Sequence, residues 1–265
     1  MNFPFFFVNT FCKGTNSGNP SGVCILEKWP STDELQNMAS QVCLPETAFL
    51  FRSEKEVWSI RCFSPKEEME FCGHASLAVI HVLFQQGLAT ENRRIKFVSK
   101  RGVLWMQALG ENRYCIDFHT LKNRPTRITP NLIEVLGAYP DEVLMGLNLV
   151  CIFKDEEIIS ELQPDFRIFS GFSSCQGVIV TSETSKTGFD FISRCFASGM
   201  RFQEDHGTVS AHRQLAHYWS KKLGKEKLVG YQSSLRGAEI RCQISSDHVI
   251  IEGKAETFIS GSTNL

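Results

Sequence analysis

The 265-residue sequence lacks the short motifs that mark the commonest nucleotide, hydrolase and metal sites. It has no Gly-x-Gly-x-x-Gly, no P-loop and no Gly-x-Ser-x-Gly segment, which argues against nicotinamide, nucleotide and serine-hydrolase chemistry. It also has no His-Glu-x-x-His motif, and its ten cysteines never form Cys-x-x-Cys. We therefore expect neither a metal nor a cofactor.

An excess of charge of one sign is also missing. Lys and Arg number 28 against 29 Asp and Glu, so a nucleic-acid partner is not expected. The longest apolar helical segment, residues 75–84, is too short to cross a bilayer. The apolar run 3–8 follows no basic region and precedes no small-residue cleavage site, which favours a strand over a signal peptide. We expect a soluble, cytoplasmic protein with reduced, mostly buried cysteines.

The composition itself, 42% hydrophobic and 22% charged, is that of a globular protein with an ample core. The segment 71–87 predicts a buried central helix, because only Ser76 and His81 are polar between Ala75 and Phe84. Gly87 is placed to end that helix in a left-handed cap. The first turn, near residues 73–75, offers unpaired backbone amides that suit a carboxylate or phosphate.

A second polar segment, residues 204–212, precedes another helical pattern at 213–223, which Gly224 ends. Each half of the chain thus has one polar, glycine-containing start to one central helix. Two such starts facing each other would enclose an anion between two helix N-termini.

The order of predicted elements repeats in the two halves, on either side of a polar segment at 119–130 that reads as a linker. We predict an N-terminal domain, 1–119, and a C-terminal domain, 120–265, with the option that the final strand returns to the first domain. Further helices are expected at 32–41, after the capping box at Ser31–Glu34, and shortly after Thr129. Strands are expected near 5–9, 22–26, 57–63, 95–98, 103–109, 114–118, 149–153, 177–181, 189–196, 228–232, 239–245 and 248–252.

Glu46 is the first candidate for chemistry, because it stands at the mouth of an apolar strand. Burial there disfavours the ionised form of the carboxylate, so the side chain is better able both to take a proton and to return it. His74, at the start of the central helix, could donate to a substrate carboxylate or move a proton. An exposed glutamate and a capping or core histidine are the alternatives, and His81 is expected to be structural.

The segment 204–212 leaves several interpretations open. Its carboxylates and histidines could ligate a metal, but their spacing fits no compact motif. Asp205 could be a helix cap, which is compatible with ligand binding by the same amides. A two-thiol mechanism through Cys72 is disfavoured, because the matching segment has no cysteine and Cys195 lies several residues too early.

Taken together, these residues resemble the PhzF family, named for the phenazine-biosynthesis isomerase. The matching segments run in order along almost the whole chain: Gly18-Asn19-Pro20, Glu46 to Phe49, Phe63-Ser64-Pro65, Cys72 to Ala75, Arg194 to Phe196, Glu204-Asp205 with Thr208 and Ser210-Ala211-His212, and Tyr231-Gln232 with Ser234, Arg236 and Gly237.

The resemblance implies an α+β protein with the diaminopimelate epimerase-like fold. Two similar domains, each a curved, mostly antiparallel sheet around a central helix, would flank a cleft that holds the site. It also implies a cofactor-free isomerase of a small carboxylic acid, commonly a homodimer, with Glu46 as acid and base. The other catalytic positions would be His74 and Asp205. The substrate-binding positions would be Asn19, Gly73, Thr208, Val209 and Ser210.

The sequence departs from the family pattern at the second helix start. The family usually has Glu-Asp-Pro-x-Thr-Gly-Ser there, whereas this chain has His206 in place of the proline and Val209 in place of the glycine. Because valine is β-branched, we expect a tighter pocket and a substrate other than dihydro-hydroxyanthranilate. A racemase or epimerase of an amino or hydroxy acid, and a non-catalytic ligand-binding protein, stay open as alternatives.

Overall fold

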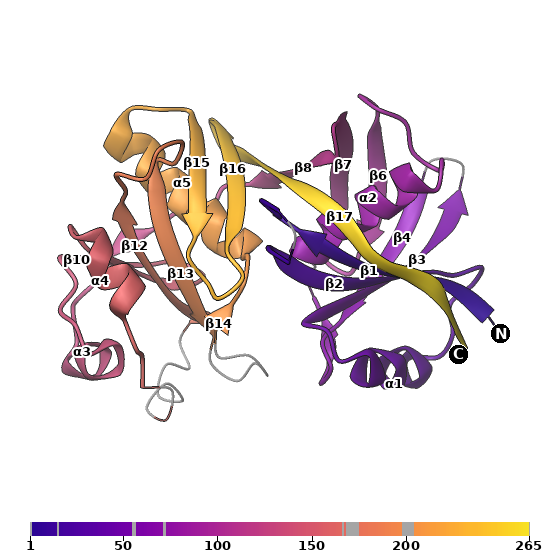
Figure 1. Ribbon diagram of the computed structural model, residues 1–265, viewed down its shortest axis with the longest axis horizontal. Coiled ribbons are helices and arrows are strands. Elements are labelled where there is room, and N and C mark those ends of the chain that lie inside the picture. Colours follow the sequence, from indigo (N-terminus) through magenta and orange to yellow (C-terminus); the bar gives the residue numbers. More distant parts are fainter. Residues whose placement is uncertain are drawn as a thin grey trace. The chain divides into compact units, whose positions relative to one another are not determined.

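The computed structural model describes residues 2–14, 16–54, 57–70, 73–165, 167, 175–197 and 204–264. Figure 1 shows two groups of strands, each with helices packed on it. Unit 1 comprises residues 1–118 and 252–265, and unit 2 comprises residues 119–251. Within the described part of the chain, no helix is long and apolar enough to cross a membrane.

Unit 1 wraps a curved sheet around helix α2 (His74–Gln85), which packs against β1, β2, β3 and β7 (Figure 1). Most strand pairs are antiparallel, while β2–β3 and β4–β6 are parallel. Strand β8 also pairs with β17, so the order of strands closes on itself around the helix. The strands are β1 (Asn2–Thr10), β2 (Asn19–Ile25), β3 (Glu46–Glu54), β4 (Val57–Phe63), β5 (Glu68–Met69), β6 (Arg94–Ser99), β7 (Gly102–Gly110), β8 (Arg113–His119) and the last part of β17 (His248–Asn264).

Helices α2 and α1 (Thr32–Val42) pack on opposite faces of this sheet, and the sequence predicts both of them. The residues of α2 from His74 to Leu83 are all buried, as its apolar composition predicts, and Gly87 takes the predicted left-handed conformation at φ +69°. Helix α1 packs on the other face, against β3 and β4. The predicted capping box is present, with Ser31 accepting from the Glu34 amide.

Unit 2 has the same plan, with helix α5 (Val209–Leu223) packed on β15 and β16 and α4 (Glu156–Glu161) packed on β12 and β13 (Figure 1). Helix α3 (Pro130–Leu136) begins at the predicted Thr129 cap with proline at its first position. The strands are β9 (Arg124–Pro125), β10 (Glu142–Met145), β11 (Leu149–Ile152), β12 (Gly177–Glu183), β13 (Phe191–Ala197), β14 (Glu204–Asp205), β15 (Lys227–Gln232), β16 (Ala238–Ser245) and the start of β17.

The two units share one topology. In unit 1, β2 pairs in parallel with β3, then β3 with β4 antiparallel and β4 with β6 in parallel; β11, β12, β13 and β15 repeat this pattern in unit 2. The register extends the match to single residues. Phe63 is paired with both Thr47 and Glu68, and Phe196 is paired in the same way with Val178 and Glu204. Residues of these matched strands in one unit can therefore be assigned counterparts in the other.

Several local predictions differ from the structure. Helix α5 begins at Val209 instead of residue 213, because the His212 amide already makes the helical bond to the Thr208 carbonyl, at 3.1 Å. The short elements α4 and β10 were not predicted, and β17 continues far beyond residue 252. Cys62 is disulfide-bonded, against the expectation of reduced thiols, while the other eight described cysteines are free.

Candidate functional site

Glu46 is a buried carboxylate on the face of the unit 1 sheet that meets α2. It is the first residue of β3 and lies opposite Ser21 of β2. Alternate residues of a strand point to opposite faces, and Phe49, three residues further along and thus on the other face, packs against α1. The Glu46 side chain is only 8% exposed, so the alternative of an exposed strand-end glutamate is wrong.

His74 and the first turn of α2 surround the Glu46 carboxylate. Oε2 of Glu46 lies 3.5 Å from Nδ1 of His74 and accepts a long hydrogen bond, 3.4 Å, from the Ala75 amide. No side chain caps α2 at Gly73. The His74 side chain is 6% exposed, and its Nε2 atom is buried without a hydrogen-bond partner in the described structure. An unmet polar atom beside a buried carboxylate and a helix N-terminus is what a polar ligand would satisfy.

Asn19 belongs to the same face of the unit 1 sheet. It is the first residue of β2, and the strand alternation places it on the face of Ser21 and Glu46. It is fully buried, and its carbonyl accepts from the hydroxyl of Thr10 at 3.1 Å. The structure thus brings Glu46, Gly73 and His74 together in unit 1 and places Asn19 on the same face of the sheet.

The predicted residues of unit 2 gather at the start of α5, held by Gln232 of β15. The Gln232 side chain accepts from the Thr208 amide at 2.8 Å and donates to the Asp205 carbonyl at 2.6 Å. Oδ2 of Asp205 accepts from the Thr208 hydroxyl at 2.6 Å. Thr208 is the N-cap residue of α5, so the alternative of Asp205 as the cap is wrong. The Thr208 side chain makes no capping bond, which leaves the first-turn amides to other acceptors.

The two positions at which this segment departs from the family pattern, His206 and Val209, differ in burial. Val209 is 1% exposed, so its side chain is packed inside unit 2. Ser210 follows it in the first turn and is half-buried. The carbonyl of His206 accepts from the hydroxyl of Ser234 at 3.1 Å, which fixes the backbone before the helix.

The metal and thiol interpretations of residues 204–212 find no support in the geometry of the described residues. Glu204 forms a two-bond ion pair with Arg194 of β13, and His212 directs Nδ1 to the Thr208 carbonyl at 2.9 Å. Burial, with the Asp205 charge second, raises the pKa of the Cys195 thiol to about 12, which keeps it protonated. Cys72 lies outside the described residues.

The two units differ at the position of Glu46 and at the first residue of the central helix. Through the shared register, the counterpart of Glu46 is Gly177, the residue before Val178. The first residue of α2 is His74, whereas the first residue of α5 is Val209. Unit 1 therefore holds a carboxylate where unit 2 holds a glycine.

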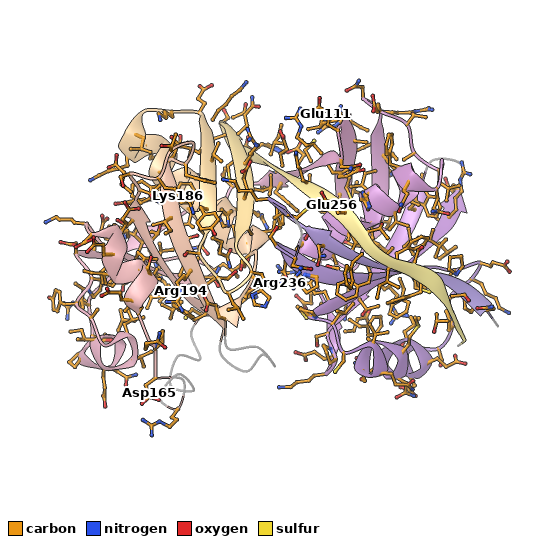
Figure 2. All side chains as sticks on the ribbon, viewed as in Figure 1. Glu111, Asp165, Lys186, Arg194, Arg236 and Glu256 are labelled. Atoms are coloured by element: carbon orange, nitrogen blue, oxygen red, sulfur yellow. The ribbon has the colours of Figure 1, made fainter. Side chains whose placement is uncertain are left out.

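A cavity of about 370 Å³ lies elsewhere in unit 2. Its lining includes Glu156, Glu157 and Glu161 of α4, with Lys186 as the basic side chain (Figure 2). Three carboxylates make it a poor place for an acidic ligand.

Two α+β units, each with a curved sheet around a central helix, define a protein of the diaminopimelate epimerase-like fold. The model of the PhzC-PhzF family, described as phenazine biosynthesis-like protein, matches residues 8–261. The chain belongs to this family. Because relatives over its whole length are named isomerases, the chain is an isomerase-type enzyme.

Similar proteins extend over the whole chain. An uncharacterized isomerase of Pseudomonas aeruginosa is 34% identical over 265 residues, which are 100% of both chains. A solved PhzF-family structure from Enterococcus faecalis is 35% identical, covers 100% of both chains and has a TM-score of 0.94. A probable proline racemase from Agrobacterium radiobacter K84 shares the fold at 10% identity, with a TM-score of 0.68 over 99% of this chain and 93% of that one.

Proposed function

We propose that this chain isomerises a small carboxylic acid without a cofactor, with Glu46 as the group that removes a proton from carbon and returns it elsewhere on the same molecule. The observation that carries the proposal is the buried pair of Glu46 and His74 at the uncapped N-terminus of α2. A buried carboxylate within reach of a second proton-carrying group is the arrangement that general acid–base catalysis needs.

The difference between the units supports a mechanism with one base. Inversion by two bases needs a proton-accepting group on each side of the reacting carbon, and the counterpart of Glu46 is Gly177. We assign proton transfer to Glu46 and His74. Asp205, with the amides of Thr208, Val209 and Ser210, is proposed to bind the acid, because first-turn amides favour anions.

The substrate is proposed to be smaller than the phenazine precursor, or differently oriented. Glycine in the first turn would let a planar carboxylate approach without interference, whereas Val209 has a β-branched side chain with few rotamers. The homodimer expected from the resemblance remains a proposal as well.

The experiment begins with a panel of small carboxylic acids, including benzoate, screened by thermal shift. Each acid that binds is then incubated with the enzyme in D₂O and analysed by mass spectrometry and chiral chromatography. We expect deuterium incorporation without inversion at a single centre. In Glu46→Gln the rate should fall by about 10²–10⁴-fold, while the thermal shift is retained.

Glu54→Gln is the matched control, because Glu54 is an exposed glutamate at the other end of β3. It should exchange deuterium at the wild-type rate. Undiminished exchange in Glu46→Gln would show that Glu46 is not the base. Incorporation with an inverted product would favour a racemase, and binding without any exchange would favour the non-catalytic alternative.

A further inference from the structure

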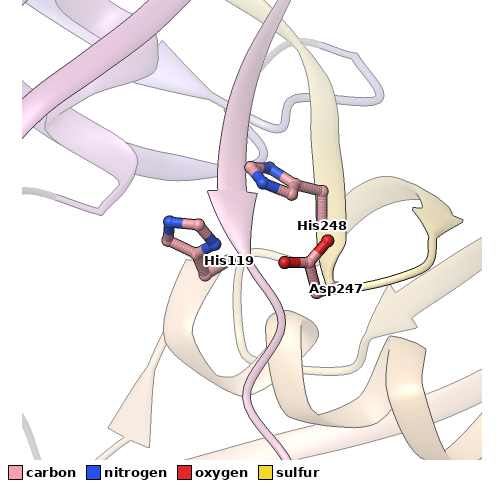
Figure 3. A group of neighbouring side chains, drawn as sticks. All are labelled: His119, Asp247 and His248. Carbon is pink, nitrogen blue, oxygen red and sulfur yellow. The ribbon is translucent and has the colours of Figure 1, made fainter.

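A second group of chemistry-bearing side chains lies away from Glu46, where β8 ends and β17 begins. Figure 3 shows His119, the last residue of β8, beside Asp247 and His248. His248 is the first residue of β17, and Asp247 lies in the turn before it. The turn is fixed to β8 because the amide and hydroxyl of Thr120 donate to the Asp247 carbonyl, at 2.8 and 3.1 Å.

The three side chains present ligand atoms toward a common region. One imidazole nitrogen from each histidine and one carboxylate oxygen all lie within 4.8 Å of one another, and the two rings are 4.5 Å apart. Ligands of a tetrahedral zinc ion at about 2.0–2.1 Å lie about 3.4 Å from each other. His119 and Asp247 are exposed, so rotation of their side chains can close that difference without moving the backbone.

We infer that His119, Asp247 and His248 bind a divalent transition-metal ion, with Zn²⁺ as the best-suited ion. Two imidazoles and one carboxylate form a nitrogen–oxygen ligand set that zinc accepts, and water completes the coordination. The inference is independent of the proposed function, since it shares no residue with it.

The position of the cluster indicates what a bound ion would do. The chain leaves unit 1 at residues 118–119 and returns to it at residues 251–252, so the cluster joins the two connecting segments. The guanidinium of Arg213 on α5 donates to the His119 carbonyl, at 2.7 and 3.2 Å. A bound ion would therefore tie the end of β8 to the start of β17, beside the helix that carries Val209 and Ser210.

The test is a titration of the full chain with Zn²⁺, followed by isothermal calorimetry in a non-chelating buffer. We expect one site per chain. Because changes in outer-shell partners already weaken metal sites about 10–100-fold, loss of a ligand in His119→Ala, Asp247→Ala or His248→Ala should weaken binding by at least about 10-fold. His217→Ala on α5 is the control and should bind as the wild type does.

Two further measurements distinguish this site from the partly buried free thiols, such as Cys43 and Cys115. Co²⁺ bound here should lack the intense near-ultraviolet charge-transfer bands of thiolate ligation. Zn²⁺ should also slow amide hydrogen exchange in peptides covering residues 117–121 and 246–250 of the wild type, but not of Asp247→Ala. Equal affinity in the wild type and all three variants, thiolate bands, or no binding at 100-fold molar excess of metal would each overturn the inference.

Discussion

Gln232 illustrates how one buried side chain positions a candidate binding segment. It is fully buried and bonds the Thr208 amide, the Asp205 carbonyl and the Thr208 hydroxyl, the last at 3.2 Å. The segment 204–208 is otherwise a two-residue strand followed by a bend, so the side-chain amide of Gln232 supplies much of its fixed geometry. Tyr231-Gln232 is one of the motifs shared with the PhzF family, but no pattern in the chain indicates the contacts of Gln232.

Replacement of Gln232 by methionine should destabilise the protein by about 1–3 kcal/mol, because the Thr208 amide and the Asp205 carbonyl lose their partner. Urea unfolding followed by circular dichroism measures the change. Gln243→Met on the exposed side of β16 adds the same side chain without breaking such bonds and should change stability by less than about 0.5 kcal/mol. Equal effects of the two substitutions would contradict the role given to Gln232.

At the scale of elements, each unit anchors its outer helix with an equivalent arginine. Arg61 pairs with Glu68 at 2.8 Å and donates to the hydroxyl of Thr32 at the start of α1. Arg194 pairs with Glu204 at 2.8 Å and donates to the carbonyls of Ile159 and Leu162 at the end of α4, at 3.1 and 2.7 Å. The second arginine thus satisfies two carbonyls besides its ion pair.

The stability loss should therefore be larger for Arg194→Gln than for Arg61→Gln. The Arg194 side chain is 12% exposed, and its loss leaves Glu204 and two helix carbonyls without their partner. We therefore expect the free energy of unfolding to fall by about 2–4 kcal/mol. Arg61 is 23% exposed, and water can replace it as the partner of the Thr32 hydroxyl. The free energy of unfolding of Arg61→Gln should therefore fall by only about 1–2 kcal/mol. Chemical denaturation of both variants at one pH compares them, and the reverse order would refute this account.

At the scale of the whole molecule, each central helix contains a buried neutral histidine. His81 of α2 is bonded to the Tyr114 hydroxyl at 3.0 Å and to the Thr257 hydroxyl at 2.9 Å. His212 of α5 packs against Phe191. Burial lowers the pKa of each imidazole from 6.5 to about 4.

Both histidines should make the protein less stable in mild acid. Between pH 6.5 and 4 the unfolded chain binds protons that the folded imidazoles exclude, so the free energy of unfolding falls as pH falls through this window. Each histidine lowers the free energy of unfolding by up to about 3 kcal/mol across this window, because a shift of one pKa unit corresponds to about 1.36 kcal/mol. Urea unfolding at several pH values measures the slope, which His81→Gln should reduce. An unchanged slope in that variant would show that His81 is not the group responsible.

The sequence was sufficient for what depends on neighbouring residues. The apolar composition of 74–85 requires a buried helix, the Ser31 capping box starts α1, and Thr129-Pro130 starts α3, because these signals act within one or two turns. The ordered motifs alone also identify the family. The apolar neighbours of Glu46 indicated that it could be buried but left an exposed glutamate open, and only the structure decided for burial.

Duplication was visible in the sequence only as a repeated order of elements. The structure aligns Val23-Cys24-Ile25 with Val150-Cys151-Ile152, and Arg61-Cys62-Phe63 with Arg194-Cys195-Phe196. These short identities were present in the chain, but three-residue matches carry little weight until strand register shows that they occupy the same places.

Tertiary structure alone decided the pairings that join distant parts of the chain. Strand β17 extends to Asn264 and pairs with β1, Gln232 bonds Thr208 across 24 residues, and His119 meets His248 across β8 and β17. Such contacts arise when burial of apolar faces selects one register among many, and hydrogen bonding then completes it. Local periodicity specifies which face of a strand is buried, but it contains no information about which distant strand will cover the edge.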